Sequence, residues 1–520
     1  MKWSVGKIVS KRAMLSPDKI AIIYEDTPIT YRTLNDEVNR VCHFFQEKGL
    51  RKGDRVAVDL LNCSQFLVCY FAAAKLGLIF VPLIFRLVPR ELEYQLNRCG
   101  ARLLVFHDDV LQHIEKIRSL VCVEEDKFIF LKSSSVEGPD CPGWAIDYHE
   151  SISGRPCSEP VIEEQIDLDD PLAILFTSGV TGDPKGAVIS HGQTYFKNFH
   201  VIDYTDMRKD DVFLSQAPLC HSGGLCVAAT PCLCHGATLV IRKKFDPVKF
   251  ILDIEKYRVT LVIAFVTMLR FVLQTGILDK ADVSSVRVLF GGAEVTTKGF
   301  LDELAEKGLF LLTGYGQTEN SSMVLMPKDA AIRKQGSCGL PNFFSDVWIQ
   351  NQKGEKLSPF EIGEIVATGP NVMSCYWDAP EETKNTIVDS VLHTGDRGYI
   401  DEDGFIYMVD RIKNMYRSGG ENVYPAEVEK IILNHPKVEN VAIVGVPDET
   451  WGETGKAYMV CREGETLKKE DIIKFLDGKV ARYKFPKHIE FIDSLPVTAG
   501  GKVKKTMLKK MHMSTNTTGR

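Results

Sequence analysis

The run Thr177-Ser178-Gly179-Val180-Thr181-Gly182-Asp183-Pro184-Lys185-Gly186 directly follows the apolar, strand-like stretch Ala173-Ile174-Leu175-Phe176. Glycines let backbone N–H groups approach an anion closely, the hydroxyls add donors, and Lys185 adds positive charge. The run therefore predicts a phosphate-binding loop. It is not the Walker type, because Lys185 is followed by Gly186 and Ala187. An ordinary surface turn is the alternative for such a run taken alone, and the motifs further along the chain argue against it.

Working outward from this loop, apolar runs alternate with helical patterns, for example at 55–58, 103–106, 238–241, 261–264 and 286–290. This alternation predicts an α/β fold with parallel sheets flanked by helices. Between Val347 and Met408 short segments are separated by Gly, Asp and Pro, which predicts a small antiparallel or barrel-like unit. Beyond it, helices at 425–434 and 468–476 and strands at 438–446, 455–461 and 488–492 predict a smaller α/β domain.

Composition excludes several function classes. The chain has 520 residues and a net charge of -6, so it lacks the basic excess of a nucleic-acid-binding protein. Its 14 cysteines show no CxxC pairs or His-rich spacing, and no secretory signal opens the sequence, which favours a cytoplasmic protein. The apolar stretch Phe66 to Phe85 has the length of a membrane span, but Lys75, Gly77 and Pro82 interrupt it. We expect a buried helix at 64–75 followed by a strand at 78–83, and no transmembrane segment.

Two glycine-rich turns follow predicted strands. Gly291-Gly292-Ala293-Glu294 comes after the strand at 286–290, where small residues at a strand's carboxyl end leave space for a ligand. Gly314-Tyr315-Gly316-Gln317-Thr318-Glu319 offers a flat ring for a base, a hydroxyl for a phosphate oxygen and, in Glu319, an oxygen ligand of the kind that Mg²⁺ takes. Taken singly, a tight turn and a solvated acid are the alternatives.

Four further segments carry polar or glycine residues in suggestive order. Asp396 and Arg411 can bind ribose hydroxyls through a carboxylate and a guanidinium. His221 lies in Pro218-Leu219-Cys220-His221-Ser222-Gly223-Gly224. It could line a ligand pocket or be an ordinary histidine of the core, and the sequence leaves both interpretations open. Gly419-Gly420 precedes the helix that begins near Pro425. Lys502, in Ala499-Gly500-Gly501-Lys502, stands at the start of a basic tail.

Together, these motifs resemble those of the adenylate-forming superfamily, which includes acyl- and aryl-CoA synthetases, nonribosomal adenylation domains and luciferases. The resemblance extends from about Val9 to Lys510. The chain departs from the usual pattern at Val180, where a hydroxyl residue is common, and at Val497, where an arginine is usual. The resemblance implies an N-terminal adenylation domain at 1–410 with a barrel-like subdomain at about 345–410, a hinge at 411–413, a mobile C-terminal domain at 414–510 and a polar tail at 511–520.

The resemblance also assigns roles to residues. ATP is expected to meet residues of the phosphate loop, the strand-end turns and the ribose pair: Thr177, Ser178, Gly179, Thr181, Gly182, Lys185, Gly292, Ala293, Glu294, Tyr315, Thr318, Asp396, Arg411 and Lys502. Glu319 would hold Mg²⁺, and Thr318 and Lys502 would meet the α-phosphate. Lys413 would be the hinge about which the C-terminal domain turns, and Gly419 and Gly420 would line the path of coenzyme A.

The acid substrate is the least constrained part of the prediction. The acyl pocket is expected at His221, Ile263, Gly291, Gly314, Gly316 and Ser321, and its glycines indicate a roomy pocket without a buried charge. We therefore expect an AMP-forming acyl-CoA synthetase that uses ATP, Mg²⁺ and coenzyme A on an apolar acid, first a medium- or long-chain fatty acid. An aryl or alicyclic acid, loading of a carrier protein, and a non-catalytic nucleotide or acyl sensor remain open, as does a homodimer.

Overall fold

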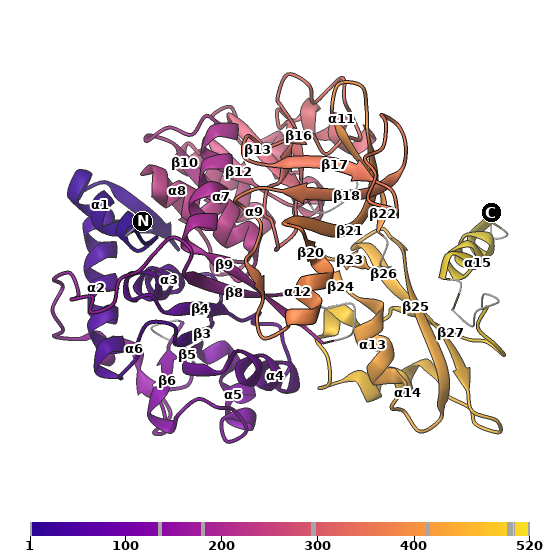
Figure 1. Cartoon of the computed structure of the whole chain (residues 1–520), viewed down its shortest axis with the longest axis horizontal. Coiled ribbons are helices and arrows are strands. Elements are labelled where there is room, and N and C mark those ends of the chain that lie inside the picture. Colours follow the sequence, from indigo (N-terminus) through magenta and orange to yellow (C-terminus); the bar gives the residue numbers. More distant parts are fainter. Residues whose placement is uncertain are drawn as a thin grey trace. The chain divides into compact units, whose positions relative to one another are not determined.

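The computed structural model describes residues 3–133, 138–177, 183–292, 298–411, 415–496, 503 and 505–517 (Figure 1). The chain divides into two compact units. The larger contains 1–85, 93–176 and 186–409, and the smaller contains 86–92, 177–185 and 410–520.

The fold of the larger unit is α/β, as the sequence predicts. Its first sheet follows the order β19-β9-β8-β4-β3-β5-β6-β7, and the pairs from β4 to β7 are parallel. In chain order these strands are β3 (Arg55–Asp59), β4 (Ile79–Pro82), β5 (Ala101–His107), β6 (Phe128–Leu131), β7 (Ile146–Asp147), β8 (Pro171–Thr177), β9 (Lys185–Ser190) and β19 (Cys375–Tyr376).

A second sheet follows the order β16-β15-β14-β13-β12-β10-β11-β1-β2, and its central pairs, from β14 to β1, are parallel. The strands are β1 (Ile20–Tyr24), β2 (Thr27–Thr30), β10 (Val212–Ser215), β11 (Thr238–Ile241), β12 (Leu261–Ile263), β13 (Val288–Gly292), β14 (Leu311–Tyr315), β15 (Val324–Leu325) and β16 (Leu340–Pro341).

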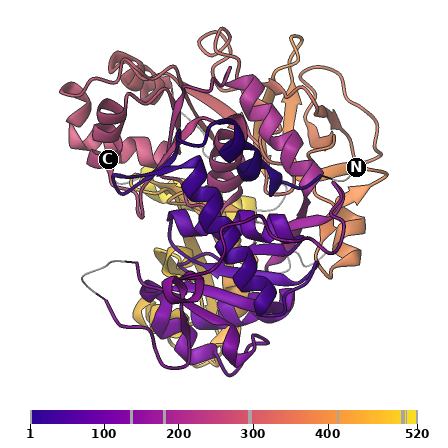
Figure 2. The ribbon, with the colours of Figure 1, turned by 90° about the vertical axis from the view of Figure 1, so that its left-hand side faces the viewer.

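The helices of the larger unit flank these sheets. They are α1 (Lys7–Leu15), α2 (Tyr31–Glu47), α3 (Ser64–Leu76), α4 (Pro89–Cys99), α5 (Leu111–Ile117), α6 (Tyr148–Ile152), α7 (His191–Tyr204), α8 (Thr230–His235), α9 (Pro247–Tyr257), α10 (Val266–Thr275), α11 (Lys298–Glu306) and α12 (Pro380–Thr386). A π-helical segment, η3 (Gly223–Ala229), precedes α8. Figure 2 shows helices of the N-terminal segment, in indigo, on the side that faces the viewer.

Local sequence explains where several helices begin and end. The Ser190 side chain accepts a hydrogen bond from the backbone N–H of Gln193, whose side chain in turn accepts from the Ser190 N–H, so a capping box starts α7. Asp246 caps α9 ahead of Pro247. Gly77, in the left-handed conformation, ends α3. Helix α3 is buried all round, which accounts for its apolar composition. No helix in the described part of the chain is long and apolar enough to cross a membrane.

Two smaller sheets follow. The antiparallel sheet β17-β18-β21-β20, with β22 beside β21, contains β17 (Asp346–Gln350), β18 (Gly363–Thr368), β20 (Ile387–Val388), β21 (Val391–Ile400) and β22 (Ile406–Arg411). The sheet of the smaller unit runs β24-β23-β26-β25, with β27 parallel to β26. It contains β23 (Tyr416–Ser418), β24 (Glu421–Val423), β25 (Val438–Asp448), β26 (Gly452–Cys461) and β27 (His488–Phe491), with helices α13 (Pro425–Ile432) and α14 (Lys469–Leu476).

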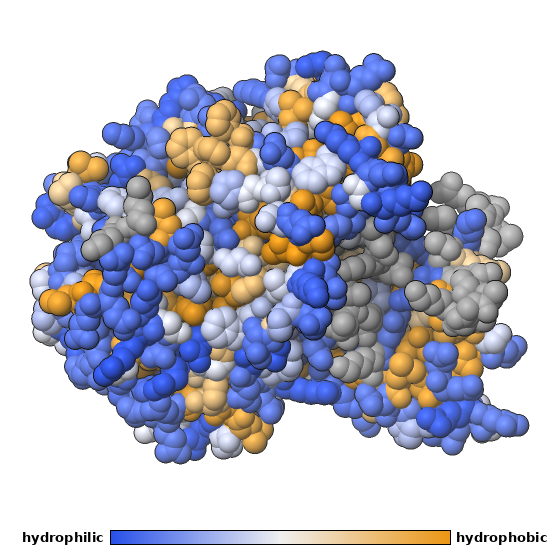
Figure 3. All heavy atoms as spheres, viewed as in Figure 1, coloured by the Kyte–Doolittle hydropathy of each residue, from blue (hydrophilic) through white to orange (hydrophobic). Residues whose placement is uncertain are grey.

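Helix α15 (Lys505–Thr517) continues into the segment expected to be a polar tail. Leu508 is fully buried, and its carbonyl oxygen accepts a hydrogen bond from the Tyr458 hydroxyl at 3.0 Å. On the face of the protein shown in Figure 3 hydrophilic residues predominate, and a group of hydrophobic ones lies over the strands of the C-terminal sheet.

Candidate functional site

The predicted phosphate-binding loop, at 177–186, follows β8 and runs into the start of β9. Thr177 ends β8, Lys185 begins β9, and the Thr177 hydroxyl donates to the Lys185 carbonyl oxygen at 3.4 Å. The loop positions Ser178, Gly179, Thr181 and Gly182 lie outside the described residues. The structure thus places the two ends of the predicted loop next to each other.

The predicted acyl-pocket glycines lie at the carboxyl ends of parallel strands. Strands β12, β13 and β14 are neighbours, and Gly292 stands opposite Gly314 in the register. A Cβ atom on Gly291 would overlap the Ala264 carbonyl oxygen, and one on Gly314 would lie 2.6 Å from the Leu325 side chain. Close packing therefore accounts for these glycines, and they give no evidence of a roomy pocket.

Ile263, also a predicted pocket residue, is buried at the end of β12. Ala293 and Glu294 lie outside the described residues. Three neighbouring parallel strands thus bring Ile263, Gly291 and Gly314 to one edge of the sheet, the usual place for a ligand in an open α/β sheet.

Asp396 is joined to the turn at 314–319. The Tyr315 hydroxyl and the Gln317 side-chain amide both donate to Oδ2 of Asp396 at 2.7 Å. Gln317 also donates to the Thr394 carbonyl oxygen at 2.9 Å, and Asp396 is 2% exposed. A carboxylate that accepts two hydrogen bonds is held in one orientation. The structure thus brings together two of the residues predicted for ATP, Tyr315 and Asp396, from 81 positions apart.

Glu319 is oriented by a residue from a different part of the chain. The Tyr376 hydroxyl donates to Oε1 of Glu319 at 2.6 Å, and the Met373 N–H donates to the Glu319 carbonyl oxygen at 2.6 Å. Glu319 and its neighbour Thr318 are half-buried. Among the described residues, no group of three or more His, Cys, Asp or Glu side chains could hold a metal ion. One oriented carboxylate fits Mg²⁺, which commonly takes one or two protein carboxylates plus substrate phosphates and waters.

The turn after Glu319 is strained. Ser321 and Ser322 have positive φ angles of 37° and 47°, which non-glycine residues seldom adopt. Gly316 fits against this turn because a Cβ there would lie 2.7 Å from the Ser322 nitrogen. The Ser321 hydroxyl is buried and has no hydrogen-bond partner among the described residues. Strain and an unpaired polar group at one turn are typical of a functional site.

Sequence reasoning missed a buried lysine nearby. Lys197, in α7, is 0% exposed, and its Nζ has no hydrogen-bond partner in the part of the chain that the structure describes. Burial lowers the pKa of Lys197 to about 8, while the nearby Cys226 and Glu319 act in the opposite direction. The sequence does contain a pattern that indicates this burial. Thr194, Lys197 and Val201 recur at helical spacing, and all three lie on the buried face of α7.

His221 lies just before η3. Its backbone N–H donates to the Pro218 carbonyl oxygen at 3.1 Å, and its own carbonyl oxygen accepts from the Leu225 N–H at 3.0 Å. The residue is half-buried. These backbone bonds place His221 at the start of a segment that packs against α7.

In the smaller unit, Gly419 and Gly420 have φ angles of 59° and 82°, which a glycine adopts without strain. A Cβ on Gly419 would lie 2.7 Å from the Trp451 ring. Arg411 is described only as the last residue of β22, and Lys413 and Lys502 lie outside the described residues. The roles predicted for these three residues stay predictions.

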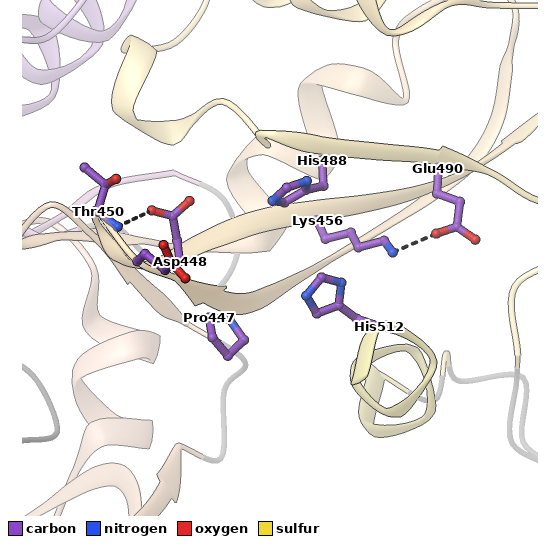
Figure 4. Close-up of a pocket in the computed structure, with 8 residues that line it drawn as sticks. Pro447, Asp448, Thr450, Lys456, His488, Glu490 and His512 are labelled. Carbon is purple, nitrogen blue, oxygen red and sulfur yellow. Dashed lines mark hydrogen bonds and ion pairs between the residues drawn. The ribbon is translucent and has the colours of Figure 1, made fainter. Parts of the chain in front are cut away.

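A separate pocket in the smaller unit contains none of the predicted site residues (Figure 4). Across it Lys456 pairs with Glu490 at 2.7 Å, and the Thr450 N–H donates to Asp448 at 2.9 Å. The rings of His488 and His512 lie 6.0 Å apart. Lys456, Glu490 and Asp448 are thus already paired within the protein and give no evidence of a ligand in this pocket.

Comparison with known proteins identifies the family. The protein-family model for the AMP-binding enzyme matches residues 9–377 of the chain. The family model for the AMP-binding enzyme C-terminal domain matches residues 427–502. The chain belongs to the AMP-binding enzyme family. This AMP-binding enzyme is 36% identical over 502 residues to a feruloyl-CoA synthase from Amycolatopsis sp., with 96% of this chain and 97% of that protein covered. It is 34% identical over 506 residues to an indoleacetate–CoA ligase from Aromatoleum aromaticum, with 97% of each covered.

A solved structure gives the same fold. The o-succinylbenzoate CoA synthetase of Bacillus subtilis, bound to a product analogue, superposes with a TM-score of 0.86 at 29% identity, over 97% of this chain and 98% of that one. This AMP-binding enzyme is therefore an acyl- or aryl-CoA ligase, and the predictions of family, fold class and enzyme class are confirmed.

Proposed function

We propose that the protein is an ATP- and Mg²⁺-dependent ligase that joins an aryl-substituted carboxylic acid, of the hydroxycinnamate or indoleacetate type, to coenzyme A. The observation that carries the proposal is the 36% identity to a feruloyl-CoA synthase over nearly the whole of both chains. The indoleacetate–CoA ligase at 34% supports the same substrate class.

The aryl acid replaces the fatty acid as the first candidate. The expectation of a fatty-acid substrate depended on glycines that suggested a deep pocket without a buried charge. Gly291 and Gly314 have a packing explanation instead, and a buried lysine lies near Glu319. Both features weaken the case for a wholly apolar acid.

The residues divide the work of binding ATP. Asp396, already held by Tyr315 and Gln317, offers its carboxylate to the ribose hydroxyls. Lys185 and the rest of the loop that begins at Thr177 bind phosphate oxygens. Glu319, oriented by Tyr376, holds Mg²⁺, which neutralises phosphate charge when bound.

The reaction proceeds in two steps. A carboxylate oxygen of the acid attacks the α-phosphorus of ATP, the bond to the bridging β-phosphate oxygen breaks, and acyl-AMP and pyrophosphate form. The coenzyme A thiol, losing its proton, then attacks the acyl carbon and expels AMP. Both reactants of the first step are anionic, so the Lys502 ammonium offsets their repulsion. A turn of the chain at Lys413 and the glycine pair Gly419-Gly420 would serve the second step.

The test is a thioester assay with the purified protein, MgATP and coenzyme A over ferulate, cinnamate, benzoate, indoleacetate, cyclohexanecarboxylate and octanoate. The proposal expects thioester and AMP from ferulate or indoleacetate with a kcat/KM at least about 10-fold above that for octanoate, a ratio within the reach of one shaped pocket. Preference for octanoate would restore the fatty acid. Pyrophosphate release without thioester would favour loading of a carrier protein, and no pyrophosphate with any acid would favour a non-catalytic binder.

A further inference from the structure

Lys197 has no evident structural reason to be a lysine. It is fully buried, and no acceptor in the described part of the chain lies within hydrogen-bond distance of Nζ. An unpaired buried ammonium is strongly destabilising. A buried polar group without a partner in the protein calls for an explanation, and a bound molecule that accepts its hydrogen bonds is one.

Lys75 provides the contrast within the same unit. It is also buried, at 5% exposed, but its ammonium donates to Asn35, Asn39 and Glu159 at 2.6–2.9 Å. The protein therefore surrounds one buried lysine with acceptors, whereas the described residues offer the other none.

A second unpaired donor stands one turn along α7. Nε2 of His200 accepts a hydrogen bond from the Phe344 N–H at 3.2 Å, and burial lowers the pKa of His200 to about 4, with the charge of Lys197 adding to the effect. The neutral ring accepts at Nε2, so its proton is on Nδ1. That Nδ1 is buried and has no partner among the described residues. Residues three apart share a helix face, so the two donors are neighbours.

The two groups that act electrostatically on Lys197 belong to segments that adjoin two predicted acyl-pocket residues, His221 and Ser321. Cys226, one of the two groups that act electrostatically on Lys197, belongs to η3, which follows His221. The other, Glu319, precedes Ser321, whose buried hydroxyl also lacks a partner in the described structure. The segment at 342–344 joins the two sides, because the Asn342 N–H donates to the Met323 carbonyl oxygen at 2.9 Å and the Phe344 N–H donates to His200.

We propose that Lys197 is a specificity-determining residue, whose ammonium, with the Nδ1–H of His200 beside it, binds an oxygen acceptor on the end of the acid remote from the reacting carboxylate. The acceptor class that fits an aryl acid is a phenolic oxygen. This inference rests on the proposed function for the identity of the acid, but not for the need of an acceptor.

The experiment uses pairs of acids that differ only in the remote oxygen: 4-hydroxycinnamate with cinnamate, 4-hydroxyphenylacetate with phenylacetate, and 8-hydroxyoctanoate with octanoate. Values of kcat/KM for thioester formation are measured for the wild type and for Lys197→Met, which keeps the side-chain length and removes the charge. The wild type should favour the hydroxylated member by about 10–100-fold, the range for a hydrogen bond to a charged group. Lys197→Met should bring that ratio to near one, mainly by losing activity on the hydroxylated acid.

Thermal unfolding distinguishes a role of Lys197 in substrate specificity from a role in the stability of the fold. Lys197→Met removes an unpaired buried charge, so its melting temperature should equal or exceed that of the wild type. Lys75→Met is the matched control, because it removes the ammonium that donates to Asn35, Asn39 and Glu159. It should have a lower melting temperature than the wild type and keep the wild-type preference ratio. An unchanged ratio in Lys197→Met, an equal loss on both members of a pair, or failure of the variant to fold would overturn the assignment.

The outcomes also distinguish the two proposals. If the aryl acids are inactive but the hydroxyoctanoate preference exists and depends on Lys197, the aryl function fails and the assignment of Lys197 stands. If aryl thioesters form without any preference within a pair, the aryl function stands and the assignment fails. No thioester from any pair would overturn both.

Discussion

The Tyr376 hydroxyl donates a hydrogen bond to Oε1 of Glu319 at 2.6 Å, which joins two residues 57 positions apart. Tyr376 is the last residue of β19, and β19 pairs with β9. Strand β9 follows the predicted phosphate-binding loop in the sequence. A strand that pairs next to the phosphate loop therefore orients the carboxylate proposed to hold Mg²⁺.

Replacing Tyr376 with phenylalanine should weaken the response to Mg²⁺. The Glu319 carboxylate would lose the donor that fixes its orientation, and loss of such an outer partner commonly costs about 10–100-fold in metal affinity or activity. We expect the Mg²⁺ concentration for half-maximal activity to rise by about 10-fold. Titration of activity with Mg²⁺ at saturating ATP measures it. Tyr399→Phe, at a tyrosine stacked on Tyr407, is the control, and equal Mg²⁺ curves for wild type and Tyr376→Phe would contradict the role.

Asp59 should make stability depend on pH. Its carboxyl group is fully buried, neither oxygen has a hydrogen-bond partner among the described residues, and burial raises its pKa from 3.8 to about 7. Between these two values the folded protein binds more protons than the unfolded chain, so this group makes stability fall as pH rises from about 4 to about 7 and stay level above. The cost at neutral pH is at most about 4 kcal/mol, because each pKa unit corresponds to about 1.4 kcal/mol.

Asp59→Asn should remove that slope. The variant should melt higher than the wild type at about pH 8 and gain little at about pH 4, where the carboxyl is protonated in both states. Melting temperatures across this range measure the effect. Asp169→Asn, at an exposed position, is the control. A wild type whose melting temperature rises from about pH 4 to pH 7 in parallel with that of Asp59→Asn would show that Asp59 is not the source.

Lys484 should be essential to the stability of the smaller unit. Its ammonium donates to Oε1 of Glu91 and to Oε1 of Glu427, both at 2.7 Å, and all three side chains are buried. Burial raises the pKa of Glu427 to about 7, with Glu91 adding to the rise and Lys484 opposing it. Lys484→Met removes the cation that two buried carboxyl groups share and should cost about 3–5 kcal/mol.

The loss from Lys484→Met should be smaller at about pH 6 than at about pH 8, since a protonated Glu427 carries no charge to bury. Urea unfolding at the two pH values measures it. Lys487→Met, at an exposed lysine, is the control. A loss equal to that of the control at both pH values would refute the account of this cluster.

Lys502 is predicted to act in the first step only. Lys502→Ala should abolish acid-dependent formation of acyl-AMP, because no positive charge would offset the repulsion between carboxylate and α-phosphate. It should largely spare thioester formation from supplied acyl-AMP. Rapid-quench assays of the two half-reactions measure this, with Lys510→Ala as the control. Equal losses in both half-reactions would refute the role.

The sequence predicted those features that depend on local pattern. The mostly apolar run at 64–75 predicted α3, and the runs at 55–58, 103–106 and 238–241 predicted β3, β5 and β11 to within a few residues. The expectation that the run at 78–83 is a strand was met by β4. Period and composition suffice here because burial on one or both faces leaves a signature in the residues themselves.

Contacts between distant segments could not be predicted in the same way. Nothing in Cys375-Tyr376 shows that this short strand pairs with β9 and reaches Glu319. Gln317 donates a hydrogen bond to Asp396, and its sequence position gave no sign of this contact. The sequence assigned roles to its neighbours in the motif, among them Tyr315, Thr318 and Glu319, but none to this residue. Lys197 was missed because a lysine in a helix is usually solvated, and only packing shows that this one is buried.

The central claim is that the acid's own carboxylate attacks the α-phosphate of ATP, and an oxygen-18 transfer experiment tests it most directly. The protein is incubated with MgATP, coenzyme A and ferulate labelled with oxygen-18 in both carboxylate oxygens, and the products are analysed by mass spectrometry. The account predicts one labelled oxygen in each AMP, one in each feruloyl thioester and none in pyrophosphate. Thioester formed with unlabelled AMP, or label in a released phosphate with ADP as the nucleotide product, would contradict it.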